Sequence, residues 1–139
     1  MASQTFSAEY KNLLKIGEFV LTEAKKVDFN SKELYAIELS VIEACENIID
    51  HAYHGENLGN IDVSAESCSE SFCVILKDQG TPFNPDEVPS PDVCSPLEIR
   101  SERGLGIYTM CKLMDEVRYD FSEPGVNILV MVKNRQAMK

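Results

Sequence analysis

Positive charge is scarce in this sequence. Its 139 residues include 13 lysines and arginines against 23 aspartates and glutamates, which gives a formal net charge of −10. An acidic surface repels the phosphate backbone of nucleic acids, and no local basic patch interrupts it, so we expect no direct nucleic-acid binding. A nucleotide in a pocket is not excluded, because backbone N–H groups and a divalent cation can offset its charge.

Long hydrophobic runs and cysteine pairs are also lacking. No segment approaches the roughly 20 apolar residues that a membrane span needs, and the N-terminus lacks the basic and apolar parts of a signal peptide. The five cysteines are odd in number and include no CxxC pair, which disfavours a disulfide framework or a zinc site and favours reduced thiols. We therefore expect a soluble cytoplasmic protein without a membrane partner.

The length and a hydrophobic content of 44% suit one domain with one core. Asn30 followed by Glu33 predicts a capping box at the start of the second helix. Strands joined by short turns should pair antiparallel and helices should cover one face, which predicts an α+β two-layer sandwich with a mixed, mostly antiparallel sheet. The expected elements are helices at 7–27, 31–54 and 104–114, strands at 61–65, 72–76, 117–121 and 126–132, and a faint first strand at 3–6.

Residues 81–103 form a long loop between the predicted elements. The segment holds five of the six prolines and shows no clear hydrophobic period. A loop of this length in a small domain is typical of a lid or a binding loop, with disorder as the alternative.

The second predicted helix carries the first of three motifs. Glu43 and Asn47 are four residues apart, so both side chains project from one face. The amide oxygen of asparagine is a suitable magnesium ligand beside phosphate oxygens. A carboxylate one turn away can accept a proton from a hydroxyl that attacks a terminal phosphate. The alternative for this pair alone is an ordinary exposed glutamate and asparagine.

The second motif follows the buried strand at 72–76. Asp78 at the strand end can accept a hydrogen bond from an exocyclic amine such as that of adenine. Gly80 allows the backbone to approach a flat ring closely. A plain strand-ending turn is the alternative for this motif alone.

The third motif opens the helix after the long loop. Gly104 and Gly106 expose backbone N–H groups to an anion at a helix N-terminus. Arg103, just before them, can contact a phosphate directly. Two glycines at this spacing are a weak signal when they stand alone.

Together and in this order, the three motifs resemble the N box, the Asp-x-Gly box and the glycine box of the Bergerat-type ATPase and kinase superfamily, which includes histidine kinases, gyrases and the heat-shock chaperone family. Within it, the chain is most similar to the bacterial anti-sigma factor serine/threonine kinases. This similarity rests on the segments EACENIIDHAYHG, DQGTPFNPDEVP, SPLEIRSERGLGIYTMCKLMDEVRY and GVNILVMVKN. It implies a single histidine-kinase-like ATP-binding domain over 1–139, with an ATP lid at about 81–103.

The resemblance implies roles for individual residues. Glu43 would be the general base, Asn47 would bind Mg²⁺, and Asp78 would read adenine. Gly80 and the loop Gly104–Gly106 would hold ATP. The further nucleotide contacts that we predict are Asp50, His51, Phe83, Arg103, Leu105, Ile107 and Asn127.

Some of these matches are less direct than others. His51 sits where the family often has histidine, whereas Asp50 matches an aspartate of the gyrase branch. Arg103 stands where many relatives carry glycine. Asn127 is expected near adenine, with a solvated turn position as the alternative.

The resemblance implies an enzyme that phosphorylates a serine or threonine of a small anti-sigma factor antagonist protein and regulates a sigma factor by partner switching. The alternative is a non-catalytic ATP-binding module that sequesters a sigma factor or another regulator. A relative that has lost ATP is a third reading, which Asp78 and the glycine loop oppose. The family often dimerises, so the resemblance leaves a homodimer open.

Overall fold

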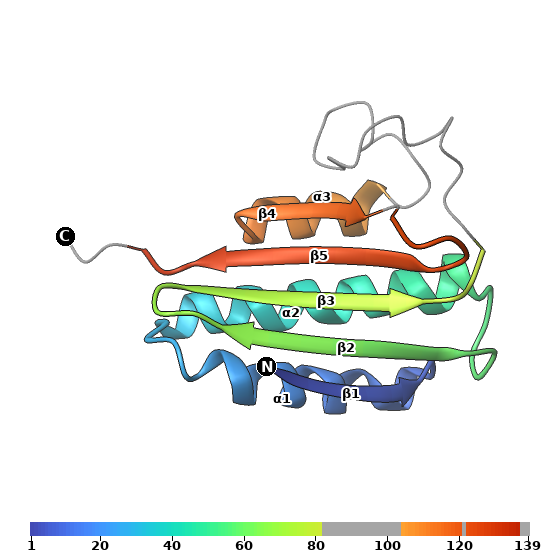
Figure 1. Ribbon diagram of the computed structural model, residues 1–139, viewed down its shortest axis with the longest axis horizontal. Coiled ribbons are helices and arrows are strands. Elements are labelled where there is room, and N and C mark those ends of the chain that lie inside the picture. The colour runs from blue at the N-terminus through green and yellow to red at the C-terminus, as the bar shows by residue number, and fades with distance from the viewer. Residues whose placement is uncertain (82–103, 121, 137–139) are drawn as a thin grey trace.

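A five-stranded sheet forms one layer of the structure, and helices cover one of its faces (Figure 1). The computed structural model describes residues 1–81, 104–120 and 122–136. The strands lie in the order β1 (Ala2–Ser7), β2 (Asn60–Ser67), β3 (Ser71–Asp78), β5 (Asn127–Asn134) and β4 (Glu116–Asp120). Every neighbouring pair is antiparallel. The predicted α+β two-layer sandwich is confirmed, and the parallel pair that a mixed sheet would include does not occur among these strands.

Within the described ranges, three α-helices form the second layer: α1 (Leu13–Ala24), α2 (Ser31–Asn47) and α3 (Gly104–Leu113). A 3₁₀-helix, η1 (Tyr10–Asn12), leads into α1. Helix α2 packs against both α1 and α3, so it is the central helix of the layer. The predicted first helix begins too early, because residues up to Ser7 pair with β2 as strand β1.

The second helix changes its winding near its end. After Asn47 the chain continues as a π-helix, η2 (Ile48–Ala52), in which the Tyr53 N–H donates to the Ile48 carbonyl five residues back at 2.9 Å. The chain then leaves through His54, which has a φ of +62°. The helix predicted at 31–54 therefore consists of a regular α-helix followed by a π-helical turn. Such π-helical turns are frequent at functional sites.

The start of α2 follows the predicted capping box. The Asn30 side chain accepts a hydrogen bond from the Glu33 N–H at 2.8 Å, and the Glu33 carboxylate accepts one from the Asn30 N–H at 2.9 Å. The second oxygen of Glu33 accepts a bond from the Gln136 N–H at 3.0 Å. The cap thus joins the start of α2 to the segment after β5.

The core lies between the helices and the inner face of the sheet. In β3, Phe72, Val74 and Leu76 are buried while the residues between them are half-buried, so this apolar run alternates as a one-sided strand does. Strand β5 is buried from Asn127 to Met131 because β3 and β4 flank it on both sides.

The described cysteines differ in burial and in disulfide bonding. Cys45 is fully buried in α2, and burial together with the nearby Glu46 charge raises the pKa of its thiol to about 12. This confirms the expected role of core filler for one thiol. Cys68 and Cys73 are also free, whereas Cys111 is disulfide-bonded, so the expectation of reduced thiols is wrong there. In the part of the chain that the structure describes, no helix is long and apolar enough to cross a membrane.

We expect Asn30→Ala to lower the free energy of unfolding by about 1 kcal/mol, because the change removes the acceptor for an N–H at the start of α2. Urea unfolding followed by circular dichroism measures the loss. Lys32→Ala, at an exposed position of the same first turn, is the matched control and should change stability by less than about 0.5 kcal/mol. Equal stability of the two variants would contradict a stabilising role for the cap.

Candidate functional site

The last turns of α2 present two polar side chains beside the core. Glu43 and Asn47 are both half-buried and lie one helical turn apart, as predicted. Glu43 forms no hydrogen bond or ion pair with any other described residue. The Asn47 Nδ2 atom is buried, and no partner for it lies within the described ranges. A buried amide nitrogen without a partner costs stability, so an unpartnered donor at this position among the described residues is typical of a functional site.

The carboxylate of Asp78 lies at the end of β3 and is buried, with 5% of its surface exposed. Its Oδ1 atom accepts hydrogen bonds from the Gly80 N–H and from the Asn127 amide, both at 2.9 Å. The same Asn127 nitrogen donates to the Thr81 carbonyl at 3.1 Å. Asn127 is buried on β5 opposite Asp78, which excludes the solvated turn position.

Gly80 packs directly on the end of the α2–η2 helix. A Cβ atom at this position would lie 2.5 Å from the carbonyl carbon and oxygen of Ala52, which no real Cβ tolerates. The next N–H, that of Thr81, donates to this Ala52 carbonyl at 2.7 Å. Close approach of backbone to backbone therefore requires glycine here. The close approach of Gly80 to a ring stays a prediction.

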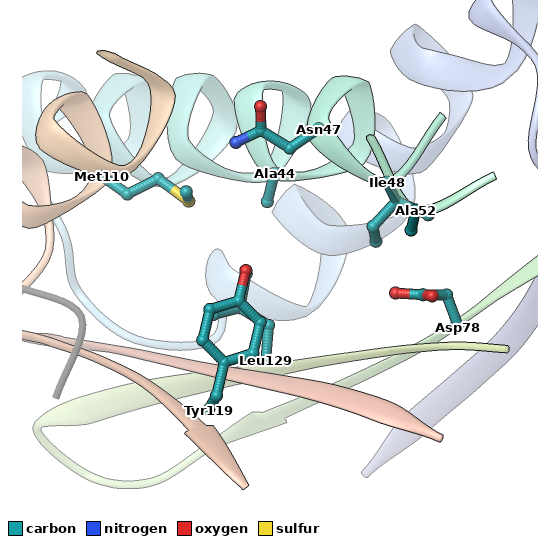
Figure 2. A pocket seen from close by; sticks show the side chains of 8 residues that line it. All are labelled: Ala44, Asn47, Ile48, Ala52, Asp78, Met110, Tyr119 and Leu129. Atoms are coloured by element: carbon teal, nitrogen blue, oxygen red, sulfur yellow. The ribbon is translucent and has the colours of Figure 1, made fainter. Parts of the chain in front are cut away.

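Asn47 and Asp78 line one cavity between the helices and the sheet (Figure 2). The ring of Tyr119 rises from β4 toward α2, and the Asp78 carboxylate points toward the end of the helix. The side chains leave about 10 Å³ of free space, close to the volume that holds one water molecule. The cavity is lined by Ala44, Asn47, Ile48, Ala52, Asp78, Met110, Tyr119 and Leu129.

Six of the eight lining residues were not among the predicted site residues, and three of these six come from elements other than the α2–η2 helix. Met110, Tyr119 and Leu129 come from α3, β4 and β5, and all three are buried. Burial alternates along β4, which indicates that Tyr119 points inward, and Leu129, in the buried stretch of β5, is its cross-strand partner on the same face. The burial pattern therefore gives the inward face. It does not say which helix they face, because that depends on how the strands pair.

The other predicted residues lie at different places. Asp50 is exposed on η2, where it accepts a hydrogen bond from the Tyr10 hydroxyl, and neither it nor His51 lines the cavity. The predicted glycine loop is the first turn of α3, the helix that packs on α2. That turn comprises Gly104, Leu105, Gly106 and Ile107. Phe83 and Arg103 lie outside the described residues.

The negative charges on the last turns of α2 lie close together. Partial burial, the Glu43 carboxylate and the Asp50 carboxylate all raise the pKa of Glu46. The charges of Glu46 and Asp50 also reach Tyr10 of η1, whose pKa is raised chiefly by its hydrogen bond to Asp50. The helix face around Glu43 is therefore strongly negative.

A one-sided antiparallel sheet, with a strand-end carboxylate and an amide of the central helix lining one cavity, is the arrangement expected of a histidine kinase-like ATPase. Residues 6–133 match the family model described as the histidine kinase-like ATPase domain, so the chain belongs to this family. The match confirms the resemblance that the three motifs carry.

Curated relatives and solved structures agree with this assignment. The serine-protein kinase RsbW of Bacillus velezensis is 34% identical over 113 residues, which cover 76% of this chain and 68% of that protein. RsbW of Bacillus mycoides is 28% identical over 127 residues, covering 88% and 77%. The catalytic domain of histidine kinase ThkA superposes with a TM-score of 0.60 at 17% identity, covering 99% of this chain and 100% of that one. The structural likeness shows the fold alone.

We expect Gly80→Ala to lower the free energy of unfolding by about 1–3 kcal/mol, because the added methyl group forces β3 away from Ala52. Nucleotide affinity should fall as well, since the shift moves the N–H that orients Asp78. Denaturant unfolding and calorimetric titration with ATP measure the two effects.

The matched control is Gly125→Asn, at a turn glycine with a φ of +78° and open space around it. Asparagine tolerates this conformation, so stability should change by less than about 1 kcal/mol. A Gly80→Ala variant as stable as the control would contradict the packing argument.

Proposed function

We propose that this chain is a serine/threonine protein kinase that transfers the terminal phosphate of ATP to a small partner protein. The family supports the use of ATP, and relatives of similar sequence are named serine-protein kinases. The observation that carries the proposal is the pairing of Glu43 with Asn47 on one helix face, above a cavity that ends at Asp78. We infer a single domain over residues 1–139, with a lid at about 81–103.

The base of ATP would lie in the cavity between Asn47 and Asp78. The Asp78 carboxylate would accept a hydrogen bond from the exocyclic amine, and Gly80 and Asn127 hold that carboxylate in place through its Oδ1 atom. Ile48, Met110 and Leu129 supply apolar walls for a flat ring. Because the free space is close to that of one water molecule, the cavity must widen when the base enters.

The donor set around Asn47 fits Mg²⁺. Among the described residues no group of three histidine, cysteine or acidic side chains could hold a metal ion. Magnesium bound to a nucleotide commonly takes one or two protein ligands and completes its shell with phosphate oxygens and water. The Asn47 amide, whose Nδ2 has no partner among the described residues, would present its oxygen as that ligand. When bound, the ion neutralises charge that develops on the phosphates.

Glu43 is placed to act as the base. Its carboxylate, without a partner among the described residues, would accept the proton of a serine or threonine hydroxyl of the bound protein. The hydroxyl oxygen then bonds to the terminal phosphorus while the bond from that phosphorus to the bridging oxygen breaks, and ADP leaves. The backbone N–H groups of Gly104 and Gly106, in the first turn of α3, would stabilise the phosphates.

The partner that we propose is an anti-sigma factor antagonist protein, with regulation of a sigma factor by partner switching. The names of the relatives support a protein kinase that acts on serine. A non-catalytic module that sequesters a sigma factor is the alternative, and the next experiment separates the two.

We expect Glu43→Gln to lower the rate of phosphoryl transfer by about 10²–10⁴-fold with little change in ATP affinity, because glutamine keeps the shape and cannot accept the proton. Labelled ATP, magnesium and the antagonist protein from the source cell measure the transfer. Glu38→Gln, on the same helix away from the cavity, is the control and should transfer at the wild-type rate. Absence of transfer by the wild type would favour the sequestering module.

We expect Asn47→Ala to abolish magnesium-dependent nucleotide binding while the protein stays folded. The Nδ2 atom of Asn47 has no partner within the described residues, so its removal should leave the melting temperature unchanged or raise it. Calorimetric titration with ATP, with and without magnesium, measures nucleotide binding, and thermal unfolding measures the melting temperature. Unchanged affinity would mean that the metal lies elsewhere.

A further inference from the structure

A surface beside Glu43 combines exposed apolar side chains with carboxylates. Tyr10 of η1 and Leu14 of α1 are four residues apart and keep 47% and 72% of their surface exposed. The Tyr10 hydroxyl donates a hydrogen bond to the Asp50 carboxylate of η2, and the Tyr10 N–H donates to the Glu56 carboxylate at 2.8 Å. The first bond joins η1 to η2 and the second joins η1 to the segment after η2, so Tyr10, Asp50 and Glu56 lie together. Leu14 follows one helical turn after Tyr10, at the start of α1.

We call this region the docking surface and define it by five residues. It consists of Tyr10, Leu14, Glu46, Asp50 and Glu56. Isolated exposed apolar side chains need no explanation, but an exposed pair that adjoins a proposed active site is typical of a binding surface.

The docking surface has little positive charge to balance its carboxylates. The chain contains no lysine or arginine between Lys32 and Lys77, a stretch that includes η2 and most of α2. Lys11 of η1 pairs with Glu9 at 3.7 Å. Within the described residues, Glu46 forms no ion pair, and the neighbouring carboxylates of Glu43 and Asp50 help to raise its pKa. A cation that arrives from outside would relieve this repulsion.

We propose that the docking surface binds a basic segment of the protein that the kinase phosphorylates, with an apolar side chain on Tyr10 and Leu14 and lysine or arginine side chains beside Glu46 and Asp50. The inference rests on the proposed function. Glu46 lies three residues after Glu43 on α2, so a segment bound here brings the neighbouring hydroxyl to the base. A second copy of this chain, bound here by the same surface, would bring the same carboxylates together, so a basic segment is the better occupant.

The test uses the full chain and two fluorescent peptides. One peptide carries leucine and lysine at helical spacing, and the other replaces each lysine by glutamate. Fluorescence anisotropy at low salt should show binding of the basic peptide alone, weakening as salt rises. Glu46→Lys and Leu14→Ser should each weaken its binding by about tenfold. ATP affinity should stay unchanged in both variants, because neither residue lines the cavity.

The control is Glu66→Lys. Glu66 is exposed on β2 next to the buried Ala65, so it lies on the sheet face away from the helices. This variant alters the net charge by the same amount as Glu46→Lys and should bind the basic peptide like the wild type. Equal weakening by the two lysine variants would mean attraction to overall charge and would overturn the proposal, as would wild-type binding by Leu14→Ser.

Phosphoryl transfer gives a second readout that separates this inference from the proposed function. With the antagonist protein as substrate, Leu14→Ser should raise KM by about tenfold and leave kcat unchanged, since an apolar contact outside the cavity acts on association. A fall in kcat at unchanged KM would overturn the docking role. If the wild type binds the basic peptide but transfers no phosphate, the docking surface stands and the kinase function fails.

Discussion

The packing of the end of β3 against the end of the α2–η2 helix is the contact on which the site depends. Gly80 touches Ala52 with no room for a side chain, and the Thr81 N–H bonds to the Ala52 carbonyl. The same turn places the Gly80 N–H on the Asp78 carboxylate. Helix and strand are thereby held at a fixed separation, and the cavity between Asn47 and Asp78 is the space that this separation leaves.

The site carries costs that the rest of the structure offsets. The Asn47 amide nitrogen is buried without a partner among the described residues, and like charges crowd the last turns of α2. Each such feature destabilises a folded chain by an amount on the order of 1–3 kcal/mol or less. The capping box at the start of α2 and the core beneath the sheet stabilise the same helix from the other side. Unpartnered and like-charged polar groups at one end of an otherwise stable helix are typical of a binding site.

Much of the architecture could be predicted from local patterns. The capping box and the strands expected at 61–65 and 72–76 depend on local patterns and were confirmed. The first helix was predicted to begin at Ser7, but Ser7 pairs with Asn60 as the last residue of β1, and a pairing between residues so far apart leaves no local signal. The π-helical end of α2 was missed, since no local pattern in 48–52 distinguishes it from an α-helix.

The chemical groups of the candidate site could be recognised from local sequence patterns: an acid and an amide one helical turn apart, an aspartate at a strand end, and glycines at the start of a helix. Their periodicity and order depend on local geometry, which the residues carry with them. Which of these groups lie together depends on tertiary contacts: Asn127 donates a hydrogen bond to Asp78, and the Tyr119 ring points toward α2. Strand pairing and helix packing join residues far apart in the chain, and no spacing within one segment encodes those contacts.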